Sequence, residues 1–131
     1  MNLTSRVIKD EEIKTLEKWW ADWSFVSPVD MLPETGLMVS SDGIDVCAAF
    51  MYITNSNVAW ISWIISDKNY RIKPNRADAL KFLIDDISRE AKALGYKYCY
   101  INFDNNHLVN TCEDLGFIKG SKTQEMIKRW D

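Results

Sequence analysis

Residues 58–76 have the sequence VAWISWIISDKNYRIKPNR, which changes character half-way. Its first nine residues are apolar or aromatic apart from two serines, and the rest is mainly polar and basic. An amphipathic pattern follows as far as Gly95, and a second apolar run occupies residues 98–103. This order predicts a strand, a loop, a helix and a parallel strand joined by a right-handed crossover. The loop would lie at the carboxyl end of the first strand, where the N–H groups of a helix N-terminus favour small anions.

The helix after this loop is predicted by an apolar stripe with spacings of three and four residues. The stripe consists of Leu80, Leu83, Ile84, Ile87, Ala91 and Leu94. Asn75 is expected to cap the helix, with Asp78 three residues on accepting a reciprocal bond. Gly95 is expected to end the helix in the left-handed conformation.

Composition and charge narrow the class of protein. With 131 residues, 47% of them hydrophobic and 27% charged, the chain is expected to form one globular domain, residues 1–131. A net charge of −3 argues against a general nucleic-acid binder. No basic start is followed by an apolar leader, and no apolar run is long enough to cross a bilayer, so we expect a soluble cytoplasmic protein without membrane contact.

The cysteines are odd in number and lack CxxC spacing. Cys47, Cys99 and Cys112 are therefore predicted to be reduced thiols. With a single histidine in the chain, we expect no zinc site and no other metal cofactor.

The first third of the chain predicts an edge strand at residues 5–8 and a helix capped by Asp10. Ile13, Leu16, Trp20 and Trp23 share one face of this helix. The aromatic cluster of Trp19, Trp23 and Phe25 has two interpretations, which are packing against a sheet or lining a substrate groove. Residues 27–34 are irregular because of their two prolines, and form either a binding loop or a connector.

Three strands joined by short turns are predicted next, at residues 37–40, 46–54 and 58–66. Strict alternation in the third would place Trp60, Ser62 and Ile64 on one face and Ile61, Trp63 and Ile65 on the other. Both faces are mostly apolar, so this strand is expected to be covered on both sides.

The last third predicts a strand at residues 98–103, a short helix capped by Asn105 or Asn106, and two final strands. The helix would end at Gly116. Phe117 would begin one strand, and residues 124–130 would form the other, with Met126, Lys128 and Trp130 alternating with Ile127 and Arg129.

This order of elements, together with Asn105, Leu108 and the run Leu115-Gly116-Phe117, resembles the GNAT superfamily of acetyl-CoA-dependent N-acyltransferases. The resemblance covers essentially the whole chain. It implies an α/β (α+β) fold with a mixed, mostly antiparallel central sheet that splays between strands four and five, with helices on both faces.

One departure from the family lies in the loop that binds the acyl donor. The family has glycines there, which let backbone amides approach the pyrophosphate, whereas this chain has Pro74 and Arg76. Four cations surround the same place, and phosphate pairs well with arginine and lysine. They are Lys68, Arg71, Lys73 and Arg76. The alternative is a solvated basic turn with no ligand.

The resemblance also implies roles for individual residues. Main-chain groups of Ile64, Ile65 and Ser66 would bind the pantetheine arm and polarise the thioester, and Asn105 would hold the CoA arm. Arg71, Lys73, Asn75 and Arg76 would bind the phosphates. Cys112 stands where many members have a tyrosine that protonates the departing thiolate, and its thiol is the candidate acid.

The base and the acceptor are less well defined by the sequence. Asp67 is the candidate base, with Glu34, His107 or a water chain as alternatives, although a helix N-terminus disfavours protonated His107. Trp23, Phe25 and Glu34 are predicted to bind the acceptor.

Two functions follow. The first is transfer of an acetyl group from acetyl-CoA to an amine acceptor, which the acidic balance suggests is cationic, by a monomer or homodimer. The second is a catalytically inactive GNAT-like domain that binds other proteins through its tryptophan-rich surface.

Overall fold

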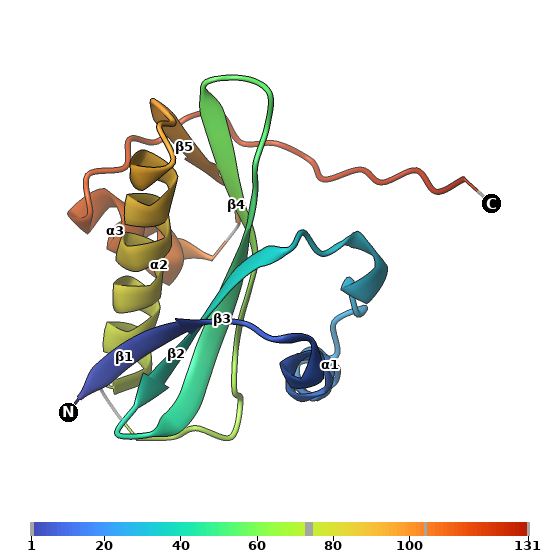
Figure 1. The fold of residues 1–131 in the computed structure, drawn as a ribbon, viewed down its shortest axis with the longest axis vertical. Coiled ribbons are helices and arrows are strands. Elements are labelled where there is room, and N and C mark those ends of the chain that lie inside the picture. The colour runs from blue at the N-terminus through green and yellow to red at the C-terminus, as the bar shows by residue number, and fades with distance from the viewer. Residues whose placement is uncertain (1, 73–74, 104, 131) are drawn as a thin grey trace.

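The structure, a computed structural model, describes residues 2–72, 75–103 and 105–130. Five strands and three α-helices, with two short 3-10 turns, make up these residues (Figure 1). In chain order they are β1 (Leu3–Val7), η1 (Asp10–Glu12), α1 (Ile13–Asp22), η2 (Val29–Met31), β2 (Thr35–Ser41), β3 (Ile44–Tyr52), β4 (Val58–Ser66), α2 (Asn75–Ala93), β5 (Tyr98–Ile101) and α3 (Asn106–Asp114).

The strands form one sheet in the order β1-β2-β3-β4-β5. β1 to β4 are antiparallel neighbours, and β5 pairs with β4 in parallel after the crossover through α2. The predicted edge strand, meander and crossover are therefore confirmed, and so is the mixed, mostly antiparallel sheet.

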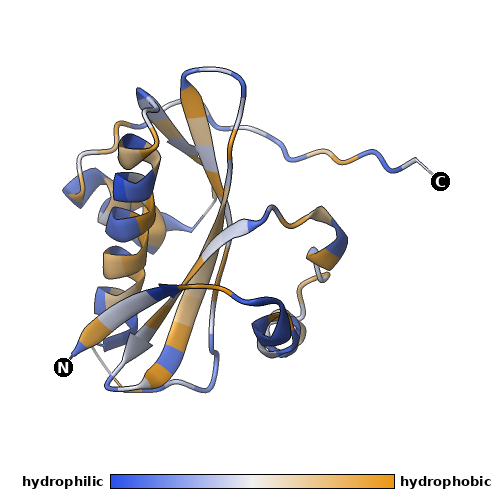
Figure 2. Ribbon diagram, viewed as in Figure 1, coloured by the Kyte–Doolittle hydropathy of each residue, from blue (hydrophilic) through white to orange (hydrophobic). Residues whose placement is uncertain are grey.

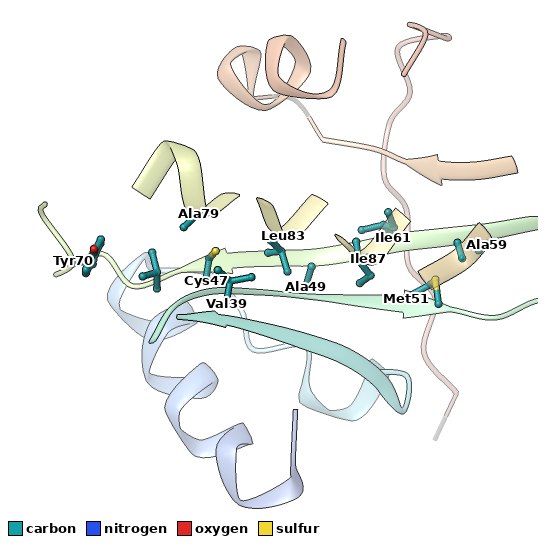
Figure 3. Close-up of a cluster of buried hydrophobic side chains, with 12 residues drawn as sticks. Val39, Cys47, Ala49, Met51, Ala59, Ile61, Tyr70, Ala79, Leu83 and Ile87 are labelled. Atoms are coloured by element: carbon teal, nitrogen blue, oxygen red, sulfur yellow. The ribbon is translucent and has the colours of Figure 1, made fainter. Parts of the chain in front are cut away.

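Helix α2 covers one face of the sheet. Its buried residues Leu83, Ile84 and Ile87 belong to the predicted stripe, whereas Leu94 lies beyond the helix and is exposed. The core on this face joins α2 to β2, β3 and β4, and Figure 3 shows its side chains pointing inward from both layers. In Figure 2 hydrophobic colouring follows the central strands, while α2 carries both hydrophobic and hydrophilic positions, as expected for a helix with one face on a sheet.

Helix α1 covers the opposite face, so helices lie on both faces as predicted. Leu16, Trp19 and Trp20 are buried there against Met38, Phe50 and their neighbours. Trp19 is therefore a core residue. The predicted cap at Asp10 is shifted by one residue, because the Glu12 side chain accepts the backbone N–H of Lys9 and Asp10 already lies in the first turn.

A β-bulge corrects the predicted faces of β4. Ser62 pairs with Phe50 and Ile65 with Ala48, so two residues of β4 stand opposite one of β3. Trp63 has a positive φ of 56° at this point. As a result Ile61 and Ile64 pack on the α2 side and Trp63 and Ile65 on the α1 side, which breaks the predicted alternation.

The predicted strands at Phe117 and at residues 124–130 are wrong. Residues 117–130 form no strand, and they run from α3 past the ends of β5 and β4 and then away from the body (Figure 1). An alternating sequence becomes a strand only where a neighbouring edge accepts its hydrogen bonds. The two helix ends are as predicted, since Gly95 and Gly116 both have φ of 95°.

Within the described residues, no helix combines the length and the apolar character needed to cross a membrane.

Candidate functional site

The sheet opens between β4 and β5. Their pairing runs from Val58 with Tyr98 to Ile61 with Ile101, whereas β4 continues to Ser66. Residues 62–66 therefore pair with β3 on one side only, among the strands that the structure describes. Their backbone groups on the other side face the opening, which gives an extended ligand a row of possible hydrogen-bond partners.

A cavity of about 170 Å³ lies in this opening. Consecutive residues of β4 form one wall, and residues after β5 and on α3 form the other. It is lined by Ile61, Ser62, Trp63, Ile64, Asn102, Phe103, Leu108 and Glu125. The site thus combines residues of a strand, apolar side chains and one acidic residue, Glu125.

Aromatic side chains flank the cavity without filling it. Trp60 stacks on Tyr52 with 5.1 Å between ring centroids, and its indole N–H donates to the Asn102 side chain at 3.0 Å. The indole N–H of Trp63 donates to the Tyr52 hydroxyl at 2.7 Å, and this hydroxyl donates to the carbonyl of Met31. Tyr52 therefore ties the 29–31 turn to the bulged part of β4.

Arg76 organises the turn at the carboxyl end of β4. Its Nη2 donates to the carbonyls of Asp67, Lys68 and Tyr70 at 2.8, 2.9 and 2.6 Å. Its Nε is buried and has no hydrogen-bond partner among the described residues. Three backbone carbonyls thus converge on a cation.

Three backbone N–H groups of this turn already have acceptors. Asp67 N–H donates to the carbonyl of Val46 in β3, Tyr70 N–H donates to the carbonyl of Asp67, and Asn69 N–H donates to the Asp67 carboxylate at 2.9 Å. The turn is therefore held by bonds within it and by one bond to β3.

Trp23 lies against the same turn. Its indole N–H donates to the carbonyl of Ser66 at 2.7 Å, and its ring stacks near Phe25 with 6.4 Å between centroids. The Lys68 ammonium lies 5.3 Å, and the Arg76 guanidinium 5.9 Å, from the centroid of the Trp23 ring. These contacts join the end of α1 to the end of β4 by hydrogen bonding and cation–π attraction.

Known structures share the fold of this chain over nearly its whole length. No family model matches the sequence, and no curated protein matches it. A Trypanosoma brucei acetyltransferase superposes with a TM-score of 0.70 at 16% identity, covering 97% of this chain and 100% of that one. The Escherichia coli ribosomal-protein-S18-alanine N-acetyltransferase gives 0.73 at 14% identity, covering 92% and 80%. An aminoglycoside N-acetyltransferase, AAC(6')-Iy, solved with CoA gives 0.68 at 13% identity, covering 97% and 100%.

The chain has a GNAT-like fold. Identities of this size establish the fold and leave the activity to be argued from the site.

The GNAT-like fold brings several of the predicted site residues together. Ile64, Ile65 and Ser66 lie in the part of β4 that has β3 but not β5 beside it, and Asp67 follows them directly. Arg76 and Trp23 meet at the same end of β4, where Trp23 touches the backbone and not the cavity wall. The Asp67 carboxylate accepts a backbone N–H of its own turn.

Other predicted residues lie apart from the cavity. Arg71, Glu34 and Phe25 are exposed, Phe25 by 57%, and none of them lines it. The Asn75 side chain donates to the Tyr70 hydroxyl at 3.4 Å. Lys73, and Pro74 beside it, fall outside the described residues.

Helix α3 holds three further candidates. The Asn105 side chain accepts the N–H of Leu108 at 3.1 Å, which confirms Asn105 as the cap. Cys112 is buried, and burial together with the nearby Cys99 raises the pKa of its thiol to about 11. Leu108, one turn earlier, lines the cavity, whereas Cys112 does not. His107 is exposed.

Sequence reasoning missed Tyr52, Asn102 and Glu125. The first two are isolated polar groups whose partners are far away in the sequence, and only the tryptophan-rich run of β4 hinted at them. Glu125 was assigned to a strand, so its place beside β4 had no sequence signal. Among the described residues, no group of histidine, cysteine, aspartate or glutamate side chains could hold a metal ion.

Proposed function

We propose that the chain is an N-acyltransferase that transfers an acetyl group from acetyl-CoA to an amine by direct attack on the thioester. The observation that carries the proposal is the opening between β4 and β5, with a cavity lined by consecutive residues of β4. An exposed strand backbone binds an extended amide chain in the way a further strand would. The pantetheine arm is such a chain, and in our proposal it lies beside residues 62–66.

Direct attack requires a polarised carbonyl, a neutral amine and close approach. In our proposal, one backbone N–H among those of Ile64, Ile65 and Ser66 polarises the thioester carbonyl. Asp67, next to the end of β4, takes the proton of the amine. Cys112 protonates the departing thiolate, and its raised pKa keeps the thiol protonated at neutral pH, as an acid requires.

The acceptor we propose is a cationic amine. Glu125 is exposed and is one of the residues that line the cavity, with Ser62 and Trp63. We propose that its carboxylate attracts the ammonium group of the acceptor at the cavity. Glu125→Gln should therefore raise KM for a diamine more than for a neutral-tailed amine and leave kcat nearly unchanged. The same change in KM for both amines on going from the parent to Glu125→Gln would contradict this role.

The phosphate end of the donor fits less well than its thioester end. The N–H groups of Asp67, Asn69 and Tyr70 are already bonded, and Arg76 donates to three carbonyls. Lys68 donates to the carbonyl of Asp22 at 3.3 Å, and Arg71 is exposed. We therefore assign the phosphates mainly to Arg71, with Lys68 and Lys73 as further cations.

This self-bonded turn favours a second candidate function, a GNAT-like domain that binds other proteins without using CoA. Arg76 is used to hold three carbonyls of the turn, and three N–H groups of the turn already have acceptors. These groups would have to leave their present partners before they could bind a pyrophosphate. In this alternative, the exposed Phe25 and the partly buried Trp23 that stacks near it would form the contact surface.

Calorimetry and thermal unfolding with CoA and acetyl-CoA separate the two functions. Binding should stabilise the fold by about 2.7 kcal/mol at a hundredfold ligand excess over the dissociation constant. An unchanged unfolding curve at millimolar CoA would rule out the enzyme and leave the binding module.

Single variants then test the assigned roles. Arg71→Ala should weaken CoA binding about tenfold without changing the unfolding temperature, because its side chain is exposed.

Cys112→Ala should lower kcat while KM for acetyl-CoA stays the same. Cys99→Ala removes a thiol without a proposed role and serves as the control. Equal kcat in both cysteine variants would remove Cys112 from the mechanism.

A further inference from the structure

The bulge in β4 decides which way the backbone of the cavity wall points. Trp63 and Ile64 together stand opposite one residue of β3, Ala49. Neighbouring residues of a strand point their backbone N–H groups alternately to its two sides, so an extra residue reverses this alternation beyond it. The side chains show the same reversal, since Ile61 packs on the α2 side and Ile65, four residues later, on the α1 side. The bulge therefore selects which N–H groups among residues 64–66 face the opening between β4 and β5.

The backbone of the bulge lies in a region that tryptophan rarely adopts. Trp63 has a φ of 56°, in the left-handed region where glycine is the usual residue. Such a conformation persists only where the surrounding structure holds it. The bulge therefore depends on the contacts that the Trp63 side chain makes.

Two kinds of contact hold the Trp63 side chain. It packs against the core on the α1 side, where Val29 and Leu32 also pack. Its indole N–H donates to the Tyr52 hydroxyl at 2.7 Å, and that hydroxyl donates in turn to the carbonyl of Met31. Because a partly buried indole N–H is unfavourable without an acceptor, the hydroxyl fixes the orientation of the Trp63 ring.

Tyr52 is itself held at both ends of its side chain. Its ring stacks on Trp60, its pairing partner in β4, and the Trp60 indole N–H donates to the Asn102 side chain. Its hydroxyl is bonded to Trp63 and to the 29–31 turn. Of the described residues, those that line the cavity include Trp63 but not Tyr52. A residue outside the cavity wall thus holds a residue within it.

We propose that Tyr52 is a positioning residue for acyl transfer, whose hydroxyl keeps Trp63 in the bulge and so turns the backbone N–H groups of residues 64–66 toward the thioester. This role rests on the proposed function, because one of these N–H groups is assigned there to the thioester carbonyl. Tyr52 acts through Trp63 and takes no part in the proton transfers.

Tyr52→Phe tests the role of the hydroxyl and keeps the ring that stacks on Trp60. Hydrogen exchange of the backbone N–H groups of residues 63–65 should become faster, because the bulge opens more often. With acetyl-CoA, kcat should fall about tenfold, which is less than the loss of a polarising donor itself costs. CoA has no acyl carbonyl to polarise, so its Kd should change less than about twofold.

Tyr96→Phe is the matched control. The Tyr96 hydroxyl also accepts one hydrogen bond and donates another, from the Thr54 N–H at 3.0 Å and to the Thr54 carbonyl at 2.9 Å. Tyr96 does not line the cavity between β4 and β5. Its variant should leave kcat and the exchange of residues 63–65 unchanged. Equal kcat in Tyr52→Phe and Tyr96→Phe would overturn the role of Tyr52.

A double variant shows whether Tyr52 acts through Trp63. Trp63→Phe removes the indole N–H, so adding Tyr52→Phe to it should lower kcat by less than about a further factor of two. A further loss of about tenfold would mean that the two effects are independent, and would overturn the positioning role.

Thermal unfolding of the parent protein with CoA distinguishes failure of this role from failure of the proposed function. A parent that CoA does not stabilise overturns the proposed function, and the role of Tyr52 with it. If the parent turns over acetyl-CoA and Tyr52→Phe has the same kcat and the same hydrogen exchange, the proposed function stands and only the role of Tyr52 is overturned.

Discussion

Gly36 in β2 is a residue whose missing side chain makes room for the core. A Cβ at this position would lie 2.6 Å from the ring of Phe50 and 2.9 Å from Cδ1 of Ile8. Phe50 is buried and pairs with Ser62, so its ring cannot move without disturbing the strand that lines the cavity. We expect Gly36→Ala to lower the free energy of unfolding by about 1–3 kcal/mol, as overpacking does elsewhere. Denaturant titration measures this change.

Gly120→Ala is the matched control. Nothing lies within 4 Å of a Cβ at Gly120, and this glycine does not have a positive φ. Its substitution should change the stability by less than about 0.5 kcal/mol. Equal stability of the two variants would show that Phe50 adjusts freely and that Gly36 is not required.

Asp45 links three strands through hydrogen bonds. Its carboxylate accepts from both terminal nitrogens of Arg6 in β1, at 2.9 and 3.0 Å, and from the Ser40 hydroxyl in β2 at 2.7 Å. The bond from Arg6 holds the pKa of Asp45 below its ordinary value of 3.8, although partial burial opposes this. A lowered pKa means that the stabilisation is complete above about pH 3.8 and is lost as the pH falls through the folded-state pKa.

We therefore expect Asp45→Asn to lower the free energy of unfolding at neutral pH by about 0.2–1 kcal/mol, because the pair with Arg6 is partly exposed. The variant should also lose less stability than the parent when the pH is lowered below 3.8. Urea titrations at neutral and acidic pH measure both effects, with the exposed Asp30→Asn as control. A parallel pH dependence in parent and variant would contradict the assigned pKa direction.

At the scale of elements, the turn between β4 and α2 depends on Arg76. Without its guanidinium, the carbonyls of Asp67, Lys68 and Tyr70 lose a charged donor, and such bonds contribute about 1.5–3 kcal/mol. Arg76→Ala should lower the stability by an amount in this range and speed hydrogen exchange in residues 67–72. Arg71→Ala, which removes an exposed arginine five residues earlier, should do neither. Unchanged exchange in Arg76→Ala would mean that the turn is held by other contacts.

The sequence predicted correctly those elements whose apolar pattern is enough to specify them and whose expected neighbours are present in the fold. The stripe from Leu83 to Ala91 specified α2 because a helix needs only its own backbone and one apolar face. The final strand was wrong because the alternation from Met126 to Trp130 specifies a strand only when an edge accepts it. The bulge at Trp63 depends on the register with β3, which a single strand does not reveal.

The candidate site was predictable in position but not in its contacts. An apolar run that ends in a basic loop placed residues 64–76 at the carboxyl end of a strand, and the structure shows this for residues 64–72 and for the start of α2 at Asn75. The sequence could not indicate that Arg76 would turn toward backbone carbonyls, since that choice follows from the path of the turn. Glu125 enters the cavity from a segment without secondary structure of its own.

At the scale of the whole molecule, binding of CoA in the opening between β4 and β5 should make the stability of the fold depend on ligand concentration. β4 contributes core residues to both faces of the sheet, Ile61 to the α2 side and Ile65 to the α1 side, so a ligand held on β4 stabilises both layers together. Above the dissociation constant, each tenfold rise in CoA concentration adds about 1.4 kcal/mol, which raises the Tm of a domain of this size by roughly 5 °C. Calorimetric scans over a hundredfold range of CoA concentration measure this slope, and a constant Tm would show that the opening does not hold the ligand.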